Sequence, residues 1–164
     1  MLLAEFNALP ADEAAAVVRP CVDIDSWVEA LVAGRPYAGL DALVDLADAR
    51  ARGWSGVEVE KALADHPRIG ERHRGSGASA GMSRGEQAGV DPRDAAVQER
   101  LAAGNAAYEE RFGRIYLVRA AGRSADEILA LLEERLDNDP ETELTVTAGQ
   151  LREIAVLRLK GLFS

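Results

Sequence analysis

Cysteine, histidine and lysine are scarce in this chain of 164 residues, which has one Cys, two His and two Lys. The single cysteine, Cys21, excludes an internal disulfide, and we expect a small buried or half-buried thiol rather than a nucleophile. One Cys and two His disfavour a tetrahedral zinc site, and no spacing suggests a carboxylate site for a harder metal. Lys61 and Lys160 leave few candidates for Schiff-base chemistry.

Long apolar runs are also missing, since none approaches the ~20 residues that span a bilayer. The N-terminus has no basic flank and soon becomes acidic, so it does not resemble a signal peptide, and the final GLFS is not an address tag. We therefore expect a cytoplasmic protein without a membrane partner. The net charge of −9 and the pI near 4.8 disfavour nucleic acid as a partner.

Hydrophobic residues make up 48% of the chain and charged residues 29%, which is typical of a folded globular protein. No linker or internal repeat divides residues 1–164, so we predict one compact domain. Helical periodicity with capped ends predicts an all-α fold of roughly seven to nine helices. The expected helices comprise a short one at the N-terminus, one opening after Pro10, and others at about 26–33, 40–52, 55–65, 92–112, 124–136 and 140–162.

Serine followed three residues later by glutamate occurs at the start of several of these helices. Ser26 with Glu29, Ser55 with Glu58, and Ser124 with Glu127 each match the capping-box pattern. We expect all three serines to cap a helix.

A glycine-rich loop is predicted between the fifth helix and the next, within residues 63–90. This segment contains both histidines and six of the fifteen glycines. A long loop in a compact helical protein is usually functional or disordered. His66 precedes Pro67, which pushes its backbone out of the α region and places the imidazole at a helix exit. The simpler interpretation is a histidine that caps a helix C-terminus, and we expect His73 to be solvated.

The sequence SRGEQ at residues 83–87 is ambiguous. By spacing alone, Ser83 and Glu86 predict only another capping box and hence a helix start. Alternatively, a helix N-terminus that emerges from a glycine-rich loop can present backbone N–H groups to an anion, with Glu86 and Gln87 beside it.

Arg158 lies on the apolar seam of the last predicted helix. An unpaired buried guanidinium costs several kcal/mol, so it needs a partner unless its head reaches solvent at a frayed helix end. Asn105 poses the same question on the apolar face of its own helix. Residues 114–122, RIYLVRAAG, are too short and too β-branched for a confident helix, and we expect them to be extended.

Five motifs occur in order: HPRIGE (66–71), SRGEQAG (83–89), NAAYEERFG (105–113), IYLVRAAG (115–122) and LRL (157–159). Together they closely resemble the family of 2-oxo-4-hydroxy-4-carboxy-5-ureidoimidazoline (OHCU) decarboxylases over essentially the whole chain. The resemblance implies a cofactor-independent carboxy-lyase without a metal, an all-α fold and a homodimer. The implied reaction completes urate degradation in purine catabolism by converting this ureidoimidazoline to (S)-allantoin.

The resemblance also implies which residues act. His66 is the expected catalytic histidine, with Glu86 as the second catalytic group. The expected substrate-binding residues are Pro67, Ser83, Arg84, Gly85, Glu86, Gln87, Tyr116, Leu117, Val118, Arg119, Ala120 and Arg158. The stretch from Tyr116 to Ala120 is expected to contribute backbone hydrogen bonds. His73 receives no role.

Two other functions are compatible with the same residues. A non-enzymatic, ligand-sensing helical module would need the polar pocket but not a titrating histidine. A related lyase could act on another ureide or imidazolone acid.

Overall fold

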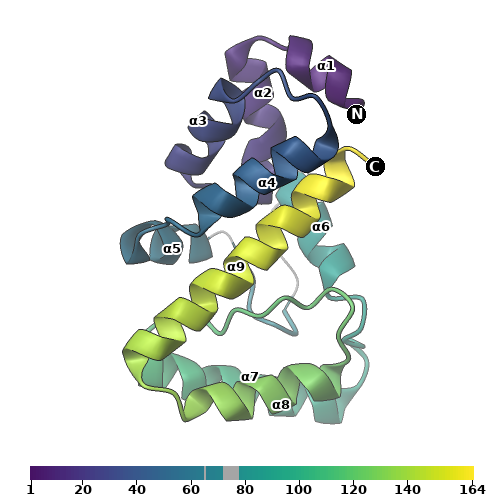
Figure 1. Cartoon of the computed structure of the whole chain (residues 1–164). Coiled ribbons are helices and arrows are strands. Elements are labelled where there is room, and N and C mark those ends of the chain that lie inside the picture. The colour runs from purple at the N-terminus through teal and green to yellow at the C-terminus, as the bar shows by residue number, and fades with distance from the viewer. Residues whose placement is uncertain (65, 72–77) are drawn as a thin grey trace. The chain divides into compact units, whose positions relative to one another are not determined.

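The structure is a computed structural model and describes residues 1–64, 66–71 and 78–164, apart from the side chain of Ser79. Over these ranges it contains nine α-helices, one short 3-10 helix and no strand, so the predicted all-α fold is confirmed (Figure 1). The helices are α1 (Leu3–Ala8), α2 (Ala11–Val18), η1 (Arg19–Cys21), α3 (Asp25–Ala33), α4 (Leu40–Ala51), α5 (Gly56–Leu63), α6 (Ala78–Glu86), α7 (Ala95–Phe112), α8 (Ala125–Leu136) and α9 (Pro140–Leu162).

The chain forms two compact units, and the two boundaries between them fall near the end of α5 and within α9. The first unit comprises Met1–Ala62 with Leu151–Ser164, and the second comprises Leu63–Gln150. A single domain over residues 1–164 stays a prediction.

The first unit is centred on Trp27 of α3, which is fully buried and donates its indole N–H to the carbonyl of Ala47 in α4. Fully buried residues from α1, α4 and the end of α9, including Phe6, Leu43 and Leu159, complete this core. Cys21 is buried here, as expected from its small apolar side chain.

The second unit is built on apolar stripes of α7 and α8. On α7, Leu101, Asn105, Tyr108 and Phe112 are buried. On α8, Ile128 and Leu132 are buried, and Leu131 and Leu136 pack partly against the same core. The connecting segment 115–120 forms neither helix nor strand, and Tyr116 and Val118 join the core from it. The expectation of an extended stretch over 114–122 is wrong at 121–122, which form a turn, and stays a prediction for 115–120.

Two of the three predicted capping boxes form. Ser55 and Ser124 each exchange hydrogen bonds with the glutamate three residues later. The third prediction is wrong, because α3 begins at Asp25 and the Ser26 hydroxyl donates to Glu58 near the start of α5 instead. A contact between distant parts of the chain thus replaces the local one.

The start of α7 also differs from prediction. The helix begins at Ala95 rather than at Pro92, and Asp94 is its N-cap, accepting from the N–H of Val97 at 3.2 Å. Asp91 instead accepts from the N–H of Arg93, which makes a turn before the helix.

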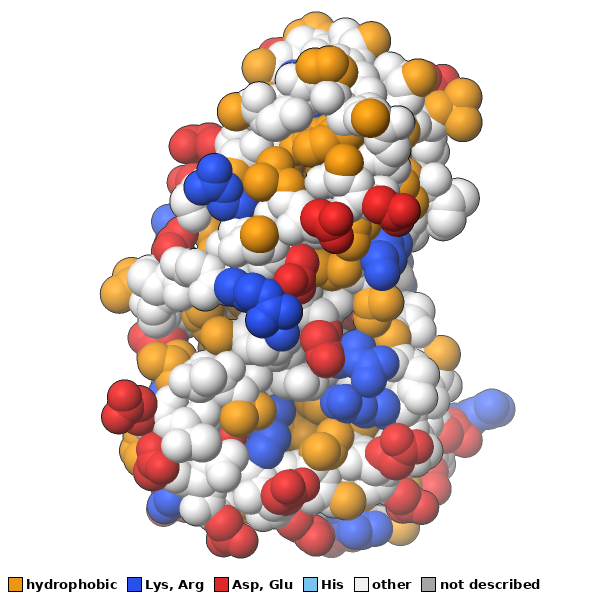
Figure 2. Space-filling model, viewed as in Figure 1, with side chains coloured by type: hydrophobic (Ala, Val, Ile, Leu, Met, Phe, Trp, Pro, Cys, Tyr) orange, Lys and Arg blue, Asp and Glu red, His pale blue; other side chains and the backbone are white. Residues whose placement is uncertain are grey.

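None of the helices in the described ranges combines the length and apolar composition needed to cross a bilayer. On the face shown in Figure 2, acidic and basic side chains are interspersed rather than separated into regions of one sign.

Ser124 and Ser26 have the same S-x-x-E pattern, but only Ser124 caps a helix, and this difference can be tested. Ser124→Ala should lower the free energy of unfolding by about 1 kcal/mol, because α8 loses its N-cap. Ser26→Ala should cost less than about 0.5 kcal/mol, because the lost bond is exposed and caps no helix. Urea unfolding of both variants measures the difference, and equal losses would contradict the assignment of the caps.

Candidate functional site

The HPRIGE sequence forms a tight turn directly after α5. The backbone N–H of His66 donates to the carbonyl of Leu63 at 3.0 Å, and the His66 side chain is half-buried. His66 therefore lies at a helix exit, as predicted. Gly70 has φ +90°, which favours glycine, and a Cβ here would lie 3.1 Å from Oε1 of Gln98.

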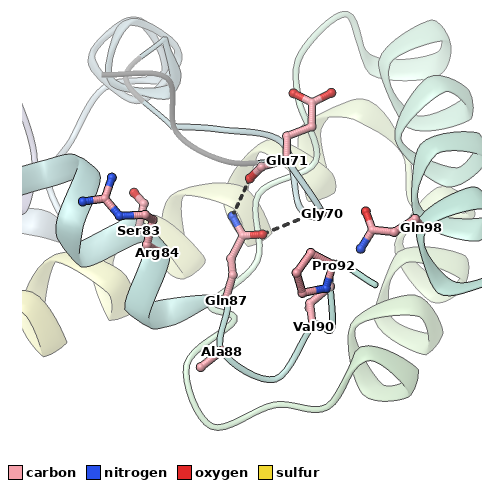
Figure 3. A pocket seen from close by; sticks show the side chains of 9 residues that line it. All are labelled: Gly70, Glu71, Ser83, Arg84, Gln87, Ala88, Val90, Pro92 and Gln98. Atoms are coloured by element: carbon pink, nitrogen blue, oxygen red, sulfur yellow. Dashed lines mark hydrogen bonds between the residues drawn. The ribbon is translucent and has the colours of Figure 1, made fainter. Parts of the chain in front are cut away.

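Two side-chain amides hold this turn in place. Nδ2 of Asn105, buried on α7, donates to the carbonyl of Ile69 at 3.0 Å. The amide of Gln87 accepts from the N–H of Gly70 at 3.0 Å and donates to the carbonyl of Glu71 at 3.4 Å (Figure 3). The question raised by Asn105 is thereby answered, since its side chain fixes the turn that carries His66.

A pocket of about 360 Å³ lies beside the turn (Figure 3). Three predicted substrate-binding residues, Ser83, Arg84 and Gln87, line it together with Gly70, Glu71, Ala88, Val90, Pro92 and Gln98. Ser83 is only 3% exposed. His66 and Glu86 are not among the described residues that line this pocket.

The predicted helix start at Ser83 is wrong. Helix α6 begins at Ala78, so Ser83 to Glu86 form its final part, and the N–H of Gln87 donates back to the carbonyl of Ser83 at 3.3 Å. The i, i+3 spacing of Ser and Glu occurs within helices as well as at their starts, and buried Ala80 and Ser83 share one face. Ser83 to Glu86 therefore lie at the C-terminal end of α6, where the helix dipole is negative. The predicted anion site at a helix N-terminus is wrong for these residues.

The segment from Tyr116 to Ala120 is tied to the protein from one side. Nη1 of Arg135 donates to the carbonyl of Leu117 at 2.6 Å, and the N–H of Arg119 donates to Oε1 of Gln150 at 2.9 Å. Nη1 of Arg123 donates to the carbonyl of Arg119 at 3.3 Å. Backbone groups of residues 117 and 119 are therefore engaged in the protein's own hydrogen bonds.

Val118 lies between these two anchored residues and is only 2% exposed. The N–H of Val118 shares a trans peptide with the carbonyl of Leu117, and its carbonyl shares one with the N–H of Arg119, so these two groups point away from Arg135 and Gln150, respectively. Within the described ranges neither group forms a hydrogen bond. Buried backbone groups are nearly always paired, so this residue is suited to bind a ligand with both donors and acceptors.

Arg135 and Glu143 form a buried ion pair that the sequence patterns did not reveal. They are 5% and 0% exposed, and Nε of Arg135 donates to Oε1 of Glu143 at 2.7 Å. Glu143 also accepts from the hydroxyl of Tyr108 and from Nδ2 of Asn138. Arg135 falls three residues after Leu132 on the stripe of α8, so the reasoning applied to Arg158 would have identified it.

Burial raises the pKa of Tyr116 to about 12. The pKa of Tyr108 is also raised, chiefly by burial and further by its bond to the Glu143 carboxylate. Both phenols therefore stay neutral near pH 7, and the hydroxyl of Tyr116 donates to the carbonyl of Ile128 at 3.0 Å. The Arg135 guanidinium lies 4.8 Å from the ring centroid of Tyr116.

Arg158 belongs to the first unit. It is 5% exposed, so the interpretation as a side chain that reaches solvent is wrong, and Nη1 donates to the carbonyl of Pro20 at 3.2 Å. Its role in binding substrate stays a prediction. His73 lies outside the described residues.

A model of the OHCU decarboxylase family matches residues 7–160. The 2-oxo-4-hydroxy-4-carboxy-5-ureidoimidazoline decarboxylase of Amia calva is 37% identical over 99 residues, which are 59% of this chain and 57% of that protein. The mouse (Mus musculus) protein of the same name is 33% identical over 135 residues, 78% of this chain and 73% of that protein. The uric acid degradation bifunctional protein of Bacillus sp. (strain TB-90) is 26% identical over 166 residues, 99% of this chain but 32% of that protein.

The fold has a counterpart among solved structures. A crystal structure of OHCU decarboxylase in the presence of (S)-allantoin superposes with a TM-score of 0.74 at 24% identity, covering 88% of this chain and 95% of that one. This likeness establishes a shared fold.

The raised pKa of Tyr116 predicts a loss of stability in alkali. Between its unfolded pKa of 10.0 and its folded value of about 12, the unfolded chain releases a proton that the folded protein retains. The stabilisation is complete below the unfolded pKa and lost as pH rises through the folded one, about 1–3 kcal/mol in total.

Urea unfolding of the wild type and Tyr116→Phe tests this dependence. The variant should be less stable at about pH 8, and the difference should shrink toward about pH 11. A difference that does not depend on pH would contradict the assignment.

Proposed function

Because the chain belongs to the OHCU decarboxylase family, we propose that it converts 2-oxo-4-hydroxy-4-carboxy-5-ureidoimidazoline to (S)-allantoin without a cofactor. The observation that carries this proposal is the family match over residues 7–160. The names of the Amia calva and mouse relatives support the same reaction. The chain spans 57% of the Amia calva protein and about a third of the Bacillus protein. Because it corresponds to only part of these relatives, their activity is a proposal for this chain.

The chemistry of decarboxylation agrees with the residues available. The electron pair left by CO₂ must be delocalised, and in this substrate its own C=N and ureide system can accept it. The protein then has to orient the substrate, place charge and deliver a proton. The ureide and imidazolone groups are rich in amide-like donors and acceptors, which suit serine, glutamine, arginine and backbone groups.

We assign His66 the proton transfer, because a histidine titrates near neutral pH and can serve one face of the intermediate. Delivery from one side would fix the stereochemistry of the product. Glu86 is proposed to orient His66 and to hold it charged. Pro67 is proposed to lie against the substrate. Residues 83–87 and Arg158 are proposed to bind the imidazolone or ureido end.

The backbone of Val118 supports a further contact. Its buried N–H and carbonyl have no partner among the described residues. A ureido group can donate to such a carbonyl and accept from such an N–H at once. We therefore propose that Tyr116 to Ala120 bind the substrate through the backbone of Val118, whereas Leu117 and Arg119 anchor the segment.

The homodimer implied by the resemblance and the cytoplasmic location expected from the sequence are part of the proposal. A homodimer is tested by analytical ultracentrifugation, and a cytoplasmic location by fractionation of the cells that produce the protein.

Replacing His66 tests the catalytic assignment. His66→Ala should lower kcat/KM by about 100-fold or more and abolish the excess of (S)-allantoin, because proton delivery from one face is lost. The measurement follows loss of freshly generated substrate and product chirality together, since the substrate also decays spontaneously to racemic allantoin. His73→Ala is the matched control and should behave as the parent.

An unchanged rate and stereoselectivity in His66→Ala would disprove its role. If the wild-type protein binds allantoin but forms none, a ligand-sensing module replaces the enzyme. A substrate panel distinguishes a lyase for another ureide.

Substitution of Arg158 tests its role in binding. Arg158→Lys keeps the charge but loses the two-pronged guanidinium, so KM should rise about 10-fold while kcat changes less. Arg152→Lys, in the same helix, is the control, because Arg152 pairs with Asp48 on the surface of the first unit. Kinetic constants for Arg158→Lys equal to those of the parent would contradict the assignment.

A further inference from the structure

We infer that Arg135 is a positioning residue for the proposed decarboxylation: through the carbonyl of Leu117 it fixes the backbone that binds the substrate at Val118. This inference rests on the proposed function and deepens it.

The guanidinium of Arg135 donates hydrogen bonds to two partners, a backbone carbonyl and a carboxylate. Nη1 donates to the carbonyl of Leu117 at 2.6 Å, while Nε donates to Glu143 at 2.7 Å. The planar group also lies against the rings of Tyr116 and Tyr108, at 4.8 and 5.8 Å from their centroids. One planar guanidinium thus contacts both the backbone of Leu117 and the ring of Tyr116.

Glu143 fixes Arg135 in turn. It is fully buried on α9 and accepts from the hydroxyl of Tyr108 on α7 and from Asn138 after α8. The orientation of Arg135 is therefore set by three helices rather than by its own flexible chain.

A second anchor acts two residues further along. Oε1 of Gln150 accepts from both the N–H of Arg119 at 2.9 Å and Nη1 of Arg123 at 3.1 Å. Anchors at residues 117 and 119 leave little freedom for Val118 between them. Rotation of either peptide plane would turn the groups of Val118 away from the side on which the substrate is proposed to bind.

Stability alone does not account for this ion pair. Replacing a buried ion pair by well-packed apolar residues is often neutral or stabilising, because both charges lose their hydration on burial. An apolar replacement cannot donate to the carbonyl of Leu117, however. The property that depends on the pair is the fixed orientation of residues 116–120.

The double variant Arg135→Met with Glu143→Gln tests the inference. It removes both buried charges and the donor to Leu117, and the new glutamine still accepts from Tyr108. We expect kcat for the folded protein to fall about 10- to 100-fold, because a displacement of about 1 Å in a positioning group can cost that much. The excess of (S)-allantoin should fall with it, since a loosely held substrate presents both faces to the proton donor.

Two controls separate positioning from loss of stability. Arg111→Met removes another arginine that donates to a backbone carbonyl, that of Asn138 rather than one in residues 116–120. Leu132→Ala destabilises the same core without removing a polar contact. Both should keep the kcat and stereoselectivity of the parent well below their unfolding temperatures.

If the double variant does not fold, Arg135→Lys provides the test. It keeps a charge beside Glu143 but cannot serve both partners in the same geometry, so kcat and stereoselectivity should fall even well below its unfolding temperature. A folded variant at Arg135 with the kcat and (S)-excess of the parent would overturn the inference. If the wild type forms no allantoin, the proposed function fails. In that case calorimetry with (S)-allantoin decides whether the variant binds more weakly, and equal affinity, or no binding to either protein, overturns the inference.

Discussion

The ion pair between Arg135 and Glu143 joins helices α7, α8 and α9 to the segment 115–120. Two charges buried to this extent lose most of their hydration, and their mutual attraction offsets the loss only when the remaining donors and acceptors are also satisfied. Tyr108, Asn138 and the carbonyl of Leu117 supply those partners, each from a different element. Helices α7, α8 and α9 and the segment 115–120 must therefore be in place together for the pair to be stable.

This requirement gives the proposed site its rigidity. An enzyme that relies on its substrate to accept the electrons of decarboxylation acts mainly by placing groups accurately, so its irregular segments must not move. The turn that carries His66 is held by Asn105 and Gln87, and the segment around Val118 is held by Arg135 and Gln150. In both places a side chain from a helix fixes a stretch that has no regular hydrogen bonding of its own.

Sequence patterns predicted the parts of this fold that depend on local contacts. The span of α9 and the caps at Ser55 and Ser124 follow from interactions within four residues, which a single sequence contains. The patterns failed where a distant residue decides the outcome, as when Glu58 binds Ser26. The role of SRGEQ was misjudged because its spacing suits both the start and the interior of a helix. Family resemblance, rather than spacing, predicted the site residues.

One rule could have extended the prediction further. Asn105, Arg135 and Arg158 are polar residues that lie on the apolar stripes of their helices, and all three are buried. In the structure each of the three donates to a backbone carbonyl outside the α-helices, those of Ile69, Pro20 and Leu117. An irregular segment packed against an all-α core leaves carbonyls that no helix satisfies, and burial makes an unpaired carbonyl costly. A polar residue on an apolar stripe therefore indicates that an irregular segment is packed there, and in an all-α enzyme such segments are where substrate can bind the backbone.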